Sequence, residues 1–126
     1  MEKREFELLV TRAIAGLPEE FRDKLENLDV VVEDRPSFSR LNDMGLRRGE
    51  TLLGLYEGVP QTRRGRSYGL VPPDKITIFQ KPIEAKCRRD NTDIADEVRK
   101  VIQHEIAHHF GIGDARLREI EEEKGN

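Results

Sequence analysis

The spacing of apolar residues near the start of the chain predicts two helices. Apolar side chains recur every three or four residues from position 6 to position 17, which is typical of an amphipathic helix. Gly16 would end this helix, and Pro18 followed by two glutamates would begin a second one. The apolar positions are Phe6, Leu9, Val10, Ala13, Ile14 and Leu17 in the first helix, and Phe21, Leu25 and Leu28 in the second.

Three short apolar runs predict β-strands. A β-branched run predicts a strand over residues 29–33, and two further runs predict strands over 52–59 and 75–80. Residues 34–50 lack periodicity and favour a long loop, and residues 61–73 favour an arginine-bearing turn region. We expect Pro82 to stop the third strand, with a charged loop leading to the helix cap at residues 91–93.

These elements predict an α+β fold, a short mixed sheet packed by helices, in a single domain over residues 1–126. Charged residues make up 37% of the chain, but the net charge is only -3, so the composition favours a folded domain over a disordered chain. Cys87 is the one cysteine and cannot form an internal disulfide. No apolar run is long enough for a membrane span, and no signal peptide is recognisable. We therefore expect a soluble, cytoplasmic protein without a membrane partner.

The long helix near the C-terminus carries the candidate chemistry. It contains the sequence His104-Glu105-Ile106-Ala107-His108, in which the two histidines lie one turn apart on the same face. Two imidazoles at this spacing can bind one Zn²⁺ ion, and Glu105 can take a proton from water at the metal. The pattern predicts a zinc site with Glu105 as general base.

A glycine turn after the helix predicts the third ligand. Gly111 can adopt the left-handed conformation that ends a helix and reverses the chain. Such a turn would bring the carboxylate of Asp114 back to His104 and His108 and would leave one position open for water, as in catalytic zinc sites. On a helical wheel, His109 falls within the apolar arc, so we expect it to point into the core and not to bind the metal.

The motif His-Glu-x-x-His-x-x-Gly-x-x-Asp resembles that of the metzincins. In length and order of elements, the chain is similar to the minimal zincin-like metallopeptidases of bacteria, which also carry Leu-Gly-Leu-Tyr-x-Gly and Ile-x-Ile-Phe segments before the motif. The resemblance covers residues 6–114 and implies a small zincin-like fold with a long C-terminal active-site helix. It implies that His104, His108 and Asp114 bind zinc and that Glu105 is the general base.

The resemblance further implies a peptide or protein substrate. Residues 52–59 would form an edge strand that pairs with an extended peptide, and the candidate substrate-binding residues are Leu55, Tyr56 and Tyr68. Tyr56, Tyr68 and the arginines of residues 61–66 are candidates for stabilising the oxyanion. The leading hypothesis is hydrolysis of a peptide bond by metal-activated water.

Two alternatives stay open. The chain leaves no room for the lower subdomain that holds substrate in larger zincins, so the site could belong to a non-catalytic metal-binding interaction module. Residues 35–66 hold seven arginines and three acidic residues, a local charge of 7 − 3 = +4, which suggests a metal-dependent endoribonuclease. The negative charge of the whole chain argues against a nucleic-acid partner. The oligomeric state does not follow from the sequence.

Overall fold

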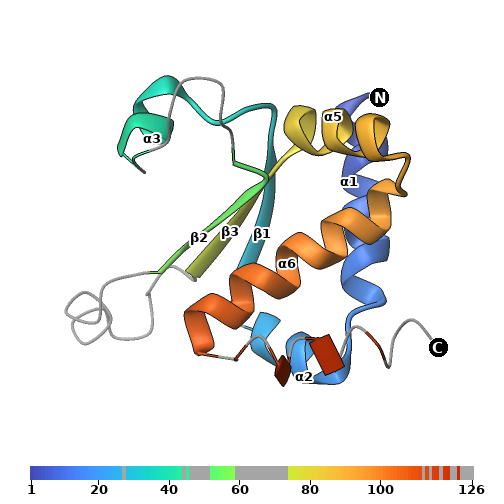
Figure 1. The fold of residues 1–126 in the computed structure, drawn as a ribbon, viewed down its shortest axis with the longest axis vertical. Helices are drawn as coiled ribbons and strands as arrows, with labels where there is room; N and C mark the ends of the chain where they lie inside the picture. Colours follow the sequence, from blue (N-terminus) through green and yellow to red (C-terminus); the bar gives the residue numbers. More distant parts are fainter. Residues whose placement is uncertain are drawn as a thin grey trace.

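A three-stranded sheet and one long helix position the rest of the chain (Figure 1). The computed structural model describes residues 1–26, 28–43, 45, 52–58, 74–111, 113, 115–116, 118–119 and 122. Its elements are α1 (Lys3–Ala15), α2 (Glu19–Arg22), a 3₁₀ turn (Asp23–Leu25), β1 (Leu28–Glu33), α3 (Phe38–Asp43), β2 (Gly54–Glu57), β3 (Asp74–Phe79), α5 (Gln80–Asp90) and α6 (Ile94–Phe110). The predicted mixed α+β fold is confirmed.

The sheet is mixed, with strand order β1-β3-β2. β1 runs parallel to β3, with Val30 opposite Ile76, and β2 runs antiparallel to β3, with Tyr56 opposite Ile76. The backbone N–H of Phe79 donates to the carbonyl oxygen of Leu53 at 3.0 Å, so odd-numbered residues of this segment turn their backbone groups toward β3. The backbone groups of Gly54 and Tyr56 therefore face away from β3.

The hydrophobic core lies between one face of the sheet and helices α1 and α6. The alternate residues Ile76 and Ile78 of β3 are fully buried and belong to the core cluster. Phe6 of α1 and Ile102 of α6 are also fully buried in this cluster. Figure 1 shows α6 crossing between the sheet and α1. The amphipathic pattern of α1 thus packs as predicted, and its helix ends at Gly16.

The side chain of Arg40, from helix α3, reaches over the opposite face of the sheet. Arg40 of α3 places Nη1 3.6 Å from a carboxylate oxygen of Glu33 on β1 and 3.6 Å from one of Glu57 on β2. Its guanidinium also lies 6.0 Å from the ring centroid of Phe79, at the end of β3. One arginine thus contacts side chains from all three strands.

Two predicted loops contain helices. Residues 80–90 form α5 rather than the end of a strand and a charged loop, because Pro82 lies in the first helical turn, where its missing N–H costs no hydrogen bond. Within the predicted loop 34–50, residues 38–43 form α3, and the backbone N–H of Arg40 donates to the hydroxyl of Ser37 at 3.1 Å. The predicted strand over 52–59 is shorter, Gly54–Glu57. The predicted turn region 61–73 lies outside the described residues.

Within the described part of the chain, no helix is both long and apolar enough to cross a membrane.

Candidate active site

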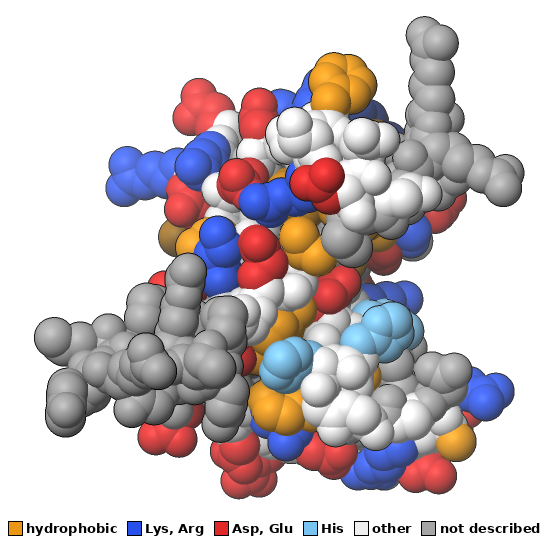
Figure 2. All heavy atoms as spheres, turned by 90° about the vertical axis from the view of Figure 1, so that its left-hand side faces the viewer, with side chains coloured by type: hydrophobic (Ala, Val, Ile, Leu, Met, Phe, Trp, Pro, Cys, Tyr) orange, Lys and Arg blue, Asp and Glu red, His pale blue; other side chains and the backbone are white. Residues whose placement is uncertain are grey.

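Helix α6 carries the candidate catalytic residues on its exposed C-terminal half. Asp93 caps the helix by accepting a hydrogen bond from the backbone N–H of Asp96 at 3.1 Å, as predicted for the cap region. His104 and His108 are exposed and lie one turn apart on one face of the helix. Figure 2 shows histidine side chains gathered on one face of the molecule. This exposure leaves both imidazoles accessible to a metal ion from solvent.

Gly111 ends α6 in the left-handed conformation that its position in the motif predicts. Its φ is 71°, and its backbone N–H donates to the carbonyl oxygen of Ala107. Asp114 and Tyr68 lie outside the described residues, so the third ligand and the second tyrosine stay predictions. Among the residues that are described, no three His, Cys, Asp or Glu side chains lie close enough together to hold a metal ion.

Glu105 is half-buried beside the helix face that carries the two exposed histidines, and it is held from β2. Its Oε2 accepts a hydrogen bond from the backbone N–H of Tyr56 at 3.2 Å. Burial raises the pKa of the Glu105 carboxyl, and this effect exceeds the lowering by the Tyr56 N–H and by the charges of His108 and His104. A carboxyl with a raised pKa is a stronger base once it is ionised, which suits the predicted role of Glu105.

Strand β2 lies along α6 in a regular register. A Cβ built on Gly54 would lie 2.5 Å from Cγ1 of Val101, and one built on Gly58 would lie 3.4 Å from Cε1 of His109. Between these two close approaches lies the contact of the Tyr56 N–H with Glu105.

The spacing of these three contacts has a simple geometric cause. Two strand residues advance about 6.6 Å, and four helix residues advance about 6.0 Å, so every second residue of β2 meets every fourth residue of α6. The absence of a side chain at position 54 lets the strand come close enough for the Tyr56 N–H to reach Glu105.

The side chain of Tyr56 belongs to a polar cluster beside Glu105. Its hydroxyl donates to Oδ2 of Asp74 at 2.8 Å, and its ring stacks on the imidazole of His109 with centroids 3.9 Å apart and planes 15° apart. Asp74 is buried, and its Oδ2 lies 3.9 Å from Nε2 of His109. Tyr56 was predicted to contact substrate, but in this structure its hydroxyl and one face of its ring contact the protein itself. Leu55, the other predicted substrate residue on β2, is half-buried and lies opposite Thr77 in the sheet.

The expectation that His109 points into the core is wrong. Its side chain is 40% exposed and lies against Tyr56 and the ring of Phe110. The helical wheel places His109 on the arc that is buried earlier in the helix, but at this end of α6 that arc faces β2 and the start of β3 instead of the core. Asp74 was not identified from the sequence. Its one signal is an acidic residue two positions before Ile76, in phase with the alternating apolar positions of β3.

The donor chemistry of the described residues fits a zinc ion. Two accessible imidazoles at helical spacing are typical zinc ligands, and the adjacent carboxyl is directed by the Tyr56 N–H instead of being free to take up other positions. His109 is separated from this pair by its stacking on Tyr56, so it is not part of the predicted ligand set.

Comparison with known proteins supports the same fold and identifies a family. The sequence pattern of the zincin-like metallopeptidases matches residues 25–124. Among solved structures, the chain is similar to a conserved hypothetical protein from Thermo thermophilus, with a TM-score of 0.58 and 23% identity over 87% of this chain and 94% of the other. This likeness supports the fold alone. No curated protein matches the chain. Because the family pattern spans most of the sequence, the chain belongs to the zincin-like metallopeptidase family.

Proposed function

We propose that this protein is a zinc-dependent peptidase in which His104, His108 and Asp114 hold the metal and Glu105 acts as general base. The family implies a metal, usually zinc, and a peptide or protein substrate. The observation that carries the proposal is the position of Glu105, which is half-buried, lies beside the face that carries two exposed histidines and is oriented by a backbone N–H. The cytoplasm stays the expected location.

Bound zinc would supply Lewis acidity, which lowers the pKa of water and polarises the scissile carbonyl. Glu105 would accept the proton of the attacking water at one carboxylate oxygen and deliver it to the leaving amine nitrogen. The Tyr56 N–H fixes the other oxygen, Oε2, so the carboxylate is oriented before substrate arrives. Because this donor is a backbone group, its position depends on the close packing of β2 against α6.

The substrate would lie beside the end of β2. The expectation of an edge strand agrees with the strand order, in which β2 lies at one edge of the described sheet. However, Glu105 occupies the outward N–H of Tyr56. In this proposal, an extended peptide therefore pairs with the exposed Gly58, beyond Glu57, because the backbone groups of Glu57 face β3.

The decisive experiment separates metal binding from catalysis. Glu105→Gln should lower the rate of hydrolysis of a peptide library by about 10²–10⁴-fold or more, while zinc content stays at one ion per chain. His104→Ala and His108→Ala should each reduce zinc content itself. Glu7→Gln, an exposed change on α1, is the matched control and should leave rate and zinc unchanged. Full activity of Glu105→Gln would reject this mechanism.

A non-catalytic metal-binding module is the second candidate. The observation that favours it is that Glu105 occupies the outward N–H of Tyr56, a group that an edge-pairing substrate would otherwise use. Stoichiometric zinc without cleavage of any peptide in a broad library would favour this candidate over the peptidase.

A further inference from the structure

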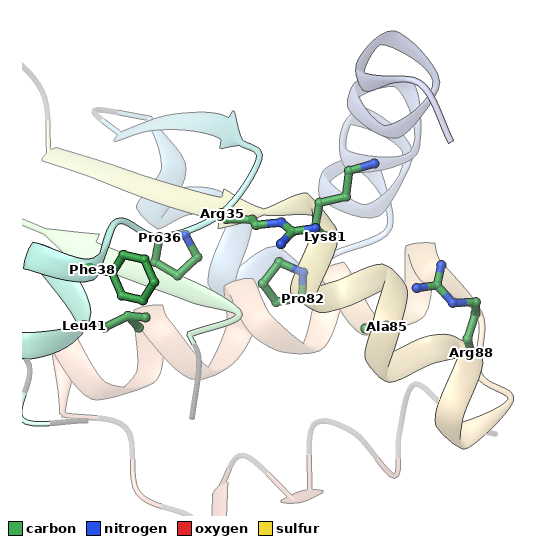
Figure 3. A pocket seen from close by; sticks show the side chains of 8 residues that line it. All are labelled: Arg35, Pro36, Phe38, Leu41, Lys81, Pro82, Ala85 and Arg88. Atoms are coloured by element: carbon green, nitrogen blue, oxygen red, sulfur yellow. The ribbon is translucent and has the colours of Figure 1, made fainter. Parts of the chain in front are cut away.

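A concave site lies at the other end of the sheet from the histidines. It is a pocket of about 450 Å³ between α3 and α5 (Figure 3). Its lining residues are Arg35, Pro36, Phe38, Leu41, Lys81, Pro82, Ala85 and Arg88. Arg35 and Lys81 follow the carboxyl ends of the parallel strands β1 and β3, whereas His109 lies beside Asp74 at the start of β3. β3 is about 17 Å long, so the two sites are separate.

The walls of this α3–α5 pocket are held in place from outside it. The backbone N–H of Lys81 donates to the carbonyl oxygen of Asp34 at 3.0 Å, which ties the segment after β1 to the first turn of α5. Arg40 binds α3 to the sheet through Glu33 and Glu57. Since Arg40 contacts the sheet, Phe38 and Leu41 are left to form the apolar wall of the pocket (Figure 3).

The pocket combines an apolar surface with positive charge. Among the lining residues that the structure describes, three are cations and none is acidic. Lys81 lies 3.6 Å from a carboxylate oxygen of Glu84, but Arg35 and Arg88 form no ion pair within the described parts of the chain. Phe38 is 92% exposed, which is exceptional for a large aromatic side chain. Uncompensated cations around exposed apolar groups are complementary to a ligand that is both acidic and apolar.

The spacing along α5 describes that ligand further. Lys81, Ala85 and Arg88 lie at positions i, i+4 and i+7, so they form one stripe with cations at its ends and a small residue in the middle. The stripe is about 10 Å long, which equals about three residues of an extended chain. In the polyproline II form of an extended peptide, residues i and i+3 lie on the same side and about 9 Å apart, so two carboxylates at this spacing would reach both cations. The side chains between them would meet Ala85 and Phe38.

We propose that the α3–α5 pocket is a docking site for an extended acidic peptide segment of another protein, with the pattern acid-apolar-apolar-acid. The proposal does not rest on peptide hydrolysis, because binding at this pocket is measured without turnover. Arg88 would bind one carboxylate, Lys81 and the neighbouring Arg35 would bind the other (Figure 3), and Phe38 would pack on an apolar side chain of the peptide.

The test measures binding of a fluorescein-labelled peptide containing Glu-Leu-Phe-Glu to the full chain by fluorescence anisotropy. Glu105→Gln protein is used so that the probe stays intact. Arg88→Glu should weaken binding by about tenfold or more, because it replaces a charge-assisted hydrogen bond with repulsion. Arg89→Glu is the matched control, since it makes the same change at the next residue of α5 but outside the pocket, and it should alter affinity less than twofold.

Further arms test the chemistry of the ligand. Phe38→Ser should also weaken binding, and a Gln-Leu-Phe-Gln peptide should bind much more weakly than the acidic one. Equal losses in Arg88→Glu and Arg89→Glu, equal binding of the neutral peptide, or no binding at millimolar peptide would each overturn the proposal. So would tighter binding of a single-stranded RNA oligonucleotide, or dimerisation in sedimentation that Arg88→Glu abolishes, since the occupant would then be RNA or a second copy of the chain.

Discussion

The two halves of α6 differ sharply although they form one continuous helix. Its N-terminal half is buried against α1, α5 and the sheet through Val98, Val101 and Ile102. From His104 onward, the helix buries only Ile106 and Ala107 and exposes His104 and the residues of its last turn. The first half anchors the helix by hydrophobic packing, and the second half extends beyond the core. A polar site can therefore be held rigidly without being buried, which is the condition for a catalytic metal site that solvent and substrate must reach.

The largest expected effect comes from removing buried side-chain packing in the first half of α6. Ile102→Ala removes a fully buried side chain and should lower the free energy of unfolding by about 2–5 kcal/mol. His108→Ala, in the exposed half of the same helix, should change it by less than about 0.5 kcal/mol in metal-free protein. Urea denaturation of both variants measures the contrast. Similar losses for the two substitutions would show that the halves of α6 do not differ in this way.

The close approach of β2 to α6 is the next part to break. Gly54→Ala places a methyl group against Val101 and should cost about 1–3 kcal/mol of stability. It should also lower activity, because the Tyr56 N–H would move away from Glu105. Lys100→Ala, an exposed change on the same helix as Val101, is the control. The double variant Gly54→Ala with Val101→Ala should recover part of both losses, and strict additivity would contradict the steric explanation.

Tyr56→Phe separates the two roles of this residue. Loss of the hydroxyl leaves the buried carboxylate of Asp74 without one donor and should cost about 1–3 kcal/mol of unfolding free energy. The backbone N–H to Glu105 remains, so kcat should change by no more than a few-fold. A fall in kcat of about 10²–10³-fold in a protein that stays folded would instead assign the hydroxyl to oxyanion stabilisation, as the sequence suggested.

The smallest expected effect concerns the pH dependence of stability. The folded state raises the pKa of Glu105, mainly by burial, so it binds the proton more tightly than the unfolded chain does. The associated stability is fully present below the unfolded pKa, near 4.5, and is lost as pH rises through the folded pKa. Metal-free Glu105→Gln, which is neutral at every pH, should therefore resist urea better than the unsubstituted protein at pH 7.5, and the advantage should disappear near pH 4. An advantage that grows toward low pH would contradict the sign of this shift.

The sequence predicted those elements whose signals are local and periodic. The apolar spacing of α1, the cap at Asp93 and the glycine end of α6 at Gly111 all depend on nearby residues, and the structure contains each of them. Helix α5 was missed because Pro82 suggested a stop and because two of its buried residues, Gln80 and Glu84, are polar, which obscures the amphipathic pattern.

The site was predictable only along the helix that carries it. His104, Glu105 and His108 share one element, so their relation follows from helical geometry. The roles of Tyr56 and Asp74 depend on how β2 and β3 pack near the end of α6, which the sequence pattern does not encode. The same tertiary contact explains the wrong expectation for His109, whose neighbours at the helix end are Tyr56 and Asp74.

The alignment of β2 with α6 is limited in length by the different rise of a strand and a helix. Two strand residues advance about 0.6 Å further than four helix residues, so strand and helix positions stay aligned over only a few repeats. Three aligned positions, at Gly54, Tyr56 and Gly58, are enough to bring one backbone donor to one carboxylate. A single-residue insertion within this strand would turn the residues after it to the opposite face of the sheet. The segment should therefore tolerate changes of side chain far better than changes of length.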